Sequence, residues 1–147
     1  MESIDDIIER VKKDFNVTPK NPKSLDDMNR EAYLGDPNCP ICHGIGFVGY
    51  DRSRDEKSRP TTGEIWAIYA APSHWDKGVG LALWDAARDG LQEEGCTNVT
   101  AWVPLRNERA IRFHELAGFK REMSTAKTAV VGSVKIEEVR LKRAISG

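Results

Sequence analysis

The sequence lacks several features that would place it in an obvious class of protein. No apolar run among its 147 residues approaches the roughly 20 needed to span a membrane. A secretory signal peptide begins with basic residues and continues with an apolar segment, whereas residues 1–6 of this chain are acidic. Its 22 Lys and Arg nearly cancel 23 Asp and Glu, which argues against nucleic acid or an anionic membrane as a partner. Three cysteines, an odd number, argue against a disulfide framework. We therefore expect a cytoplasmic protein with no membrane or nucleic-acid partner.

Two familiar phosphate-binding signatures are also missing. No Gly-x-x-x-x-Gly-Lys-Ser/Thr string of a P-loop occurs in the chain. A dinucleotide-binding fold needs a small residue where Leu83 stands, and residues 71–77 make too long a connection after the preceding strand. The sequence also shows no internal repeat or low-complexity segment, and its length suits one domain over residues 1–147.

Residues 64–83 nevertheless have the pattern of an anion site. A half-buried strand is followed by a short loop and then by a glycine-rich helix start. Gly78 and Gly80 have no Cβ, so a ligand can approach the backbone closely. The unpaired N–H groups and positive dipole end of the helix favour an anion, and Lys77 adds charge. The structural alternative is a glycine-softened helix start that binds nothing.

A second motif occupies residues 107–119. Asn107 suits a helix N-cap and Gly118 a helix end. The apolar residues between them recur at helical spacing: Ala110, Ile111, Phe113, Leu116 and Ala117. Taken alone, this motif describes an ordinary amphipathic helix.

Together the two motifs resemble the GNAT superfamily of N-acetyltransferases. Trp75-Asp76-Lys77-Gly78-Val79-Gly80 is similar to the family's Gln/Arg-x-x-Gly-x-Gly/Ala loop and departs from it at the first position. Residues 107–119 are similar to its Asn-x-x-Ala-x-x-Phe-Tyr-x-x-x-Gly-Phe motif. The resemblance runs from about Ile45 to the C-terminus. It implies an α+β fold (an α/β sandwich), with a mixed, mostly antiparallel sheet, splayed central parallel strands and flanking helices.

The periodicity of the chain predicts the individual elements. We expect helices over residues 4–15, 24–34, 78–94 and 107–117. We expect strands over residues 45–50, 64–70 and 98–103, and a closing hairpin of residues 120–131 and 134–145. Residues 16–23, which contain two prolines, and the charged residues 51–62 are predicted to be loops.

The first 44 residues form an atypical N-terminal third. Members of the family usually begin with a strand and add another after two helices, whereas this chain is predicted to begin in a helix. Residues 39–46, Cys-Pro-Ile-Cys-His-Gly-Ile-Gly, resemble the zinc repeats of J-domain co-chaperones. A structural zinc needs four ligands, and Cys39, Cys42 and His43 supply at most three. We therefore predict no metal, with zinc at Cys39 and Cys42 as the alternative to a turn that carries two reduced thiols.

The resemblance implies acetyl-CoA as co-substrate. The pantetheine arm would pair with the backbone of Ile68, Tyr69 and Ala70, where a backbone N–H would also hold the oxyanion. Trp75 would act through its backbone N–H, and Asn107 would bond the pantetheine arm. The predicted cofactor-binding residues are Ile68, Tyr69, Ala70, Trp75, Asp76, Lys77, Gly78, Val79, Gly80, Leu81 and Asn107.

Two residues are candidates for catalysis. An alkylammonium has a pKa near ~10, so acetyl transfer at neutral pH needs a base. Glu64 precedes Gly78 by fourteen residues, where the histone-acetylating branch of the family carries its glutamate base. His114 stands where the family usually has the tyrosine that protonates the leaving thiolate. The structural alternatives are a surface glutamate at a strand end and a histidine that merely packs.

The sequence thus predicts an N-acetyltransferase that moves an acetyl group directly from acetyl-CoA to a primary amine. The acceptor, a small molecule or a protein, is left open, as is assembly into a homodimer. The alternative is a catalytically weak acyl-CoA-binding or adaptor module on a GNAT scaffold, with or without a zinc knuckle.

Overall fold

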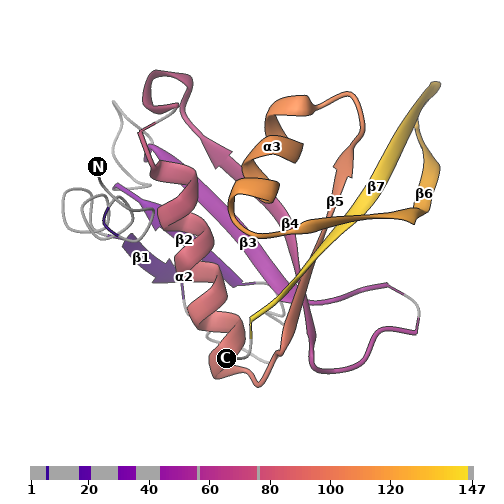
Figure 1. The fold of residues 1–147 in the computed structure, drawn as a ribbon. Coiled ribbons are helices and arrows are strands. Elements are labelled where there is room, and N and C mark those ends of the chain that lie inside the picture. The colour runs from indigo at the N-terminus through magenta and orange to yellow at the C-terminus, as the bar shows by residue number, and fades with distance from the viewer. Residues whose placement is uncertain are drawn as a thin grey trace.

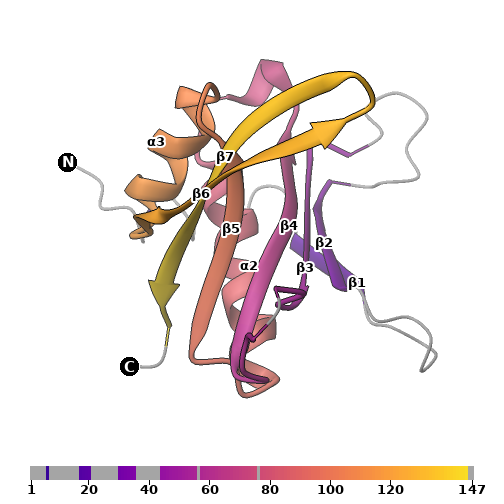
Figure 2. The ribbon, with the colours of Figure 1, turned by 90° about the vertical axis from the view of Figure 1, so that its right-hand side faces the viewer.

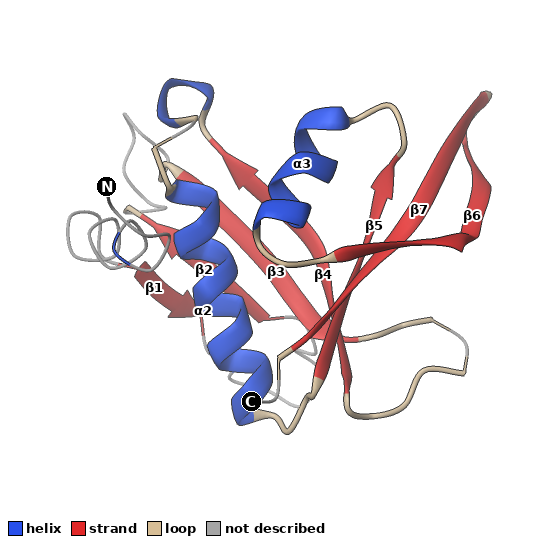
Figure 3. Cartoon of the chain, in the orientation of Figure 1, coloured by secondary structure: helices blue, strands red, loops and turns tan. Residues whose placement is uncertain are grey.

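The computed structural model describes residue 6 and residues 17–20, 30–35, 44–55, 57–75 and 77–145. The strands are β1 (Val17–Lys20), β2 (Arg30–Leu34), β3 (Gly46–Arg52), β4 (Thr62–Ala70), β5 (Asn98–Pro104), β6 (Lys120–Val131) and β7 (Val134–Ala144). The helices are the 3₁₀ turn η1 (Pro72–His74), α2 (Val79–Glu93) and α3 (Glu108–Leu116) (Figure 3).

All seven strands form one sheet in the order β1-β2-β3-β4-β5-β7-β6 (Figure 1). Every neighbouring pair is antiparallel except β4 and β5, which run parallel. The prediction of an α+β fold with a mixed, mostly antiparallel sheet is confirmed.

The two parallel strands separate along their length. They pair at only three positions, from Thr62↔Asn98 to Glu64↔Thr100, although β4 continues to Ala70 and β5 to Pro104. The register of β3 against β4 also shifts by one residue, which leaves Trp66 as an extra residue on β4. Such a bulge bends and twists a strand. The predicted splay of the central strands is therefore confirmed.

Helices α2 and α3 lie on one face of the sheet, as the two perpendicular views agree (Figures 1 and 2). Alternate residues of a strand point to opposite faces. On β5, Val99, Ala101 and Val103 are buried on the helix side, and Trp102 lies on the other face. We call this second surface, on which none of the described helices lies, the open face.

The expectation that no strand precedes residue 45 is wrong. β1 lies in the predicted 16–23 loop, where Pro19 is tolerated because β1 is the edge of the sheet. β2 lies at the end of the predicted 24–34 helix, and its Ala32 and Leu34 are fully buried in strand alternation. The N-terminal third thus contributes two strands to the common sheet.

The remaining predicted elements are present with shifts of a residue or two. β3 extends to Arg52 and β4 begins at Thr62, which shortens the predicted loop at both ends. The turn η1 was not predicted. The predicted 4–15 helix and most of the Cys39–Gly46 string lie outside the described residues. In the described part of the chain, no helix is both long and apolar enough to cross a membrane.

Candidate active site

A cavity of about 680 Å³ lies at the wide end of the β4–β5 gap. Its walls are the end of β4, η1, the first turn of α2, and α3 (Figure 1). The cavity is lined by most of the residues that the sequence singled out: Ile68, Tyr69, Ala70, Trp75, Gly78, Val79, Gly80, Leu81, Asn107 and His114. Lys77 and Glu64 are not among the lining residues, and Asp76 lies outside the described residues.

The start of α2 forms one wall of this cavity. Gly78 is the N-cap and has a left-handed backbone, with φ 84° and ψ 3°. Its carbonyl accepts the first helical bond, from Ala82 N at 3.0 Å, and no side chain of a described residue caps the helix. The N–H groups of Val79, Gly80 and Leu81 therefore have no acceptor within the helix. This arrangement favours an anionic ligand at the wall.

Gly80 has a packing role that the sequence motif did not reveal. A Cβ at this position would lie 2.9 Å from Cε1 of Phe113 on α3. The absence of a side chain therefore lets the start of α2 approach α3 closely, in addition to exposing backbone to a ligand.

Trp75 is held by two contacts at the rim of the cavity. Its indole Nε1 donates to the Ala70 carbonyl at 2.9 Å, and the Arg109 guanidinium lies 3.9 Å from the centre of its ring. Its backbone N–H, which the resemblance assigned to the pyrophosphate, donates to Pro72 O at 3.2 Å. His74, Arg109 and Arg112 also line the cavity. They were not among the predicted site residues, because nothing local distinguishes such side chains from ordinary solvated ones.

Asn107 is the N-cap of α3, as predicted. Its Oδ1 accepts from Ala110 N at 3.0 Å. The amide lines the cavity, so its Nδ2 group remains a candidate donor to the pantetheine arm. That second contact stays a prediction.

His114 is almost completely buried, with 3% of its surface exposed. Its Nδ1 lies 2.7 Å from the Ala110 carbonyl, which can only accept, so Nδ1 carries the proton. Nε2 is buried and has no hydrogen-bond partner among the described residues. Burial between the rings of Phe113 and Phe119 lowers the pKa of His114 below its usual value. The ring is therefore neutral and its Nε2 is an acceptor, which weighs against the predicted proton-donor role.

Glu64 lies at the narrow end of the gap, where β4 and β5 cease to pair. Its Oε1 accepts from Arg54 N at 3.0 Å, and the side chain is half-buried. Within the strand, Glu64 alternates with the helix-side residues Gly63 and Ile65, so it belongs to the open face. The structure does not bring it to the wall of the large cavity.

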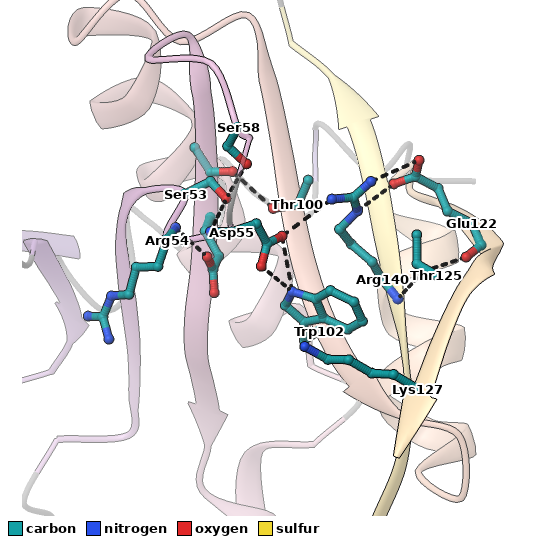
Figure 4. Close-up of polar contacts among 12 residues, drawn as sticks. Ser53, Arg54, Asp55, Ser58, Thr100, Trp102, Glu122, Thr125, Lys127 and Arg140 are labelled. Carbon is teal, nitrogen blue, oxygen red and sulfur yellow. Dashed lines mark hydrogen bonds and ion pairs between the residues drawn. The ribbon is translucent and has the colours of Figure 1, made fainter. Parts of the chain in front are cut away.

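Aromatic side chains on the open face were missed by sequence reasoning. The rings of Tyr33, Phe47 and Trp66 form a row with centroids 5.7 and 5.8 Å apart. Trp102 donates from Nε1 to both oxygens of Asp55, at 2.9 and 3.1 Å (Figure 4). Alternation along short strands was the available signal, but it does not say which strands become neighbours.

The described residues contain no group of three or more His, Cys, Asp or Glu side chains that could hold a metal. Cys39, Cys42 and His43 lie outside this part of the chain, and Cys96 is buried. The zinc alternative therefore stays a sequence-based prediction.

Comparison with known proteins gives a family and two weak curated relatives. The family model for the Acetyltransferase (GNAT) family matches residues 5–119, which includes most of the segment expected to be atypical. The mycothiol acetyltransferase of Kocuria rhizophila is 34% identical over 62 residues, 42% of this chain and 20% of that protein. The corresponding protein of Renibacterium salmoninarum is 34% identical over 59 residues, 40% of this chain and 18% of that protein. The matched part thus spans about a fifth of the length of these relatives.

Solved structures share the fold at low identity. Nourseothricin acetyltransferase has a TM-score of 0.65 at 23% identity, over 86% of this chain and 71% of that one. YncA of Salmonella typhimurium, solved with its cofactor acetyl-CoA, has a TM-score of 0.65 at 17% identity, over 81% and 66%. An N-acetyltransferase of Staphylococcus aureus has a TM-score of 0.66 at 16% identity, over 99% and 79%.

Proposed function

Because the chain belongs to the GNAT acetyltransferase family, we propose that it transfers an acetyl group from acetyl-CoA to a primary amine. The transfer is direct, within a complex that holds both substrates. The cavity at the wide end of the β4–β5 gap carries this proposal, since it joins a helix N-terminus, an unpaired strand edge and several cations.

The cavity offers complementary groups to each part of the cofactor. The first turn of α2, with Arg109 and Arg112 on the facing wall, suits a pyrophosphate. Among the described strands, the edge of β4 beyond Glu64 has no partner on the β5 side, so it can pair with an extended amide-bearing arm.

The chemistry requires one proton to leave the amine and one to reach the thiolate. The amine nitrogen attacks the thioester carbonyl, the carbon–sulfur bond breaks, and a β4 backbone N–H stabilises the oxyanion. We assign the base to Glu64, acting from the open face directly or through water. A thiol pKa near 8.5 makes thiolate a tolerable leaving group. A neutral His114 is therefore compatible with turnover.

Titration calorimetry with acetyl-CoA, followed by an amine panel scored by release of CoA thiol, tests the proposal. Binding together with amine-dependent thiol release supports it. Binding without release, across small amines and lysine peptides, favours the alternative of an acyl-CoA-binding module. Absence of binding contradicts both.

A further inference from the structure

A second cavity of about 570 Å³ lies apart from the first, at the narrow end of the gap. Every residue that lines it is polar, and four of them are cationic. The lining residues are Lys57, Ser58, Arg59, Thr61, Thr62, Thr97, Asn98, Thr100, Arg140 and Lys142. No carboxylate is among them.

The strand residues of this lining belong to the open face. On β5, Asn98 and Thr100 alternate with the buried Val99. On β7, Arg140 and Lys142 alternate in the same way with the buried Leu141. Register places Lys142 directly opposite Thr100. Figure 4 shows Ser58, Thr100 and Arg140 on the same side of the sheet.

Within the described part of the chain, most of the positive charge at this cavity is not neutralised by an ion pair. Arg140 is paired, to Glu122 Oε1 at 2.8 Å and Asp55 Oδ2 at 3.4 Å, and the Glu122 hydrogen bond raises its pKa. Lys57, Arg59 and Lys142 form no ion pair with any residue that the structure describes. Three cations that no described carboxylate neutralises surround a hollow with threonine and serine hydroxyls, and this lining matches a carboxylate or phosphate.

The cavity adjoins the proposed reaction centre. Thr100, in its wall, is the register partner of Glu64. The loop that supplies Lys57, Ser58 and Arg59 also supplies Arg54 N, which binds Glu64. An amine held near Glu64 on the open face therefore has this cationic hollow beside it.

We propose that the second cavity binds an anionic group of the acceptor, so that the acetylated amine belongs to a molecule that also carries a carboxylate or phosphate. This inference rests on the proposed acetyl transfer. The two anions share the chemistry that the cavity recognises, and separate arms of the experiment distinguish them.

The test compares kcat/KM within pairs of amines that differ in the anionic group. Phosphoethanolamine with ethanolamine is the phosphate arm, and γ-aminobutyrate with butylamine is the carboxylate arm. We expect at least one anionic member to exceed its neutral partner by about tenfold or more, equivalent to about 1.4 kcal/mol. The double variant Lys57→Gln/Lys142→Gln should bring that ratio near one. Lys135 is an exposed lysine of β7 outside both cavities, so the control variant Lys135→Gln should keep the wild-type ratio.

Three results overturn the inference. One is equal or lower kcat/KM for both anionic members in the wild type; another is a ratio that survives in the double variant. Either leaves the proposed function intact, because amines still react. If no amine in the panel reacts, thermal unfolding with inorganic phosphate, against chloride at equal ionic strength, becomes the probe. The third contradicting result is a wild-type Tm that phosphate does not raise, or a rise in Tm that the double variant shows equally.

Discussion

Gly78 combines a left-handed backbone with a place at the proposed phosphate wall. Asn and Asp both tolerate this backbone better than other side chains, so they form a matched pair that differs in charge. We expect Gly78→Asp to weaken acetyl-CoA binding by at least about tenfold more than Gly78→Asn, or about 1.4 kcal/mol. Titration calorimetry measures both affinities. Equal affinities of the two variants would contradict the placement of the pyrophosphate at the start of α2.

Glu64 tests the assignment of the base. Glu64→Gln keeps an oxygen to accept from Arg54 N but cannot take a proton. We expect kcat/KM at pH 7 to fall by about 10², with acetyl-CoA affinity unchanged. Glu137→Gln, which removes an exposed carboxylate of β7, should keep the wild-type rate. A wild-type rate for Glu64→Gln would contradict the assignment of Glu64 as the base and favour the alternative of a surface glutamate.

His114 should make the protein sensitive to mild acid. Its pKa is lowered in the folded state, so the unfolded chain binds more protons just below pH 6.5. The unfolding free energy should fall as pH drops below about 6.5, by up to about 1.4 kcal/mol per pH unit from this one residue. Denaturant titrations between pH 5.0 and 7.5 should show this dependence in the wild type and less of it in His114→Phe. If the unfolding free energy of the wild type and of His114→Phe depended on pH in the same way, the neutral, buried state of His114 would be contradicted.

At the residue scale, the sequence predicted backbone roles better than side-chain partners. The Asn107 cap follows from a local rule that acts within a few residues. The contact of Gly80 with Phe113 and the bond from Trp102 to Asp55 depend on which elements meet in the fold. Local pattern contains no such information.

At the scale of elements, length decided which predictions succeeded. Helix α2 has 15 residues and a long periodic pattern, whereas β2 has five residues and β1 four. In so short a strand, the alternation of Ala32 and Leu34 can be read equally well as part of a helix. The prolines of residues 16–23 were read as a loop signal, although an edge strand accepts proline.

The β3–β4 ladder depends on a glycine opposite the bulge. A Cβ on Gly49 would lie 2.1 Å from the Trp66 ring, which Phe47 contacts from one side. We expect Gly49→Ala to cost about 1–3 kcal/mol of unfolding free energy because of this overlap. The same change in a Trp66→Ala background should cost less, since the ring is gone. Urea denaturation of the four proteins measures the coupling, and additive effects would exclude the contact.

At the scale of the whole molecule, the sheet separates two sets of groups. The helix side holds the large cavity, with the groups proposed for the cofactor. The open face holds the aromatic row, Glu64 and the cationic cavity. Sequence reasoning predicted the splay through family resemblance, but not the contents of the open face. Those contents come from β2, β3, β4, β5 and β7 together. A single domain over residues 1–147 remains a prediction, and assembly into a homodimer stays open.

Filling the gap should stabilise the entire fold, because the two parallel strands share only three register pairs. A ligand present at 100 times its Kd adds about 2.7 kcal/mol to the unfolding free energy. For a domain of this size we expect acetyl-CoA to raise Tm by about 5–10 °C. Differential scanning calorimetry measures the rise, and Gly78→Asp should show a smaller one at the same ligand concentration. Equal shifts would place the nucleotide elsewhere.

The narrowing of the β4–β5 gap also bears on the order in which substrates bind and products are released. The proposed sites place the cofactor and the amine on opposite faces of the sheet. On this arrangement either substrate could bind first, and CoA and the acetylated product could dissociate from different faces without blocking each other.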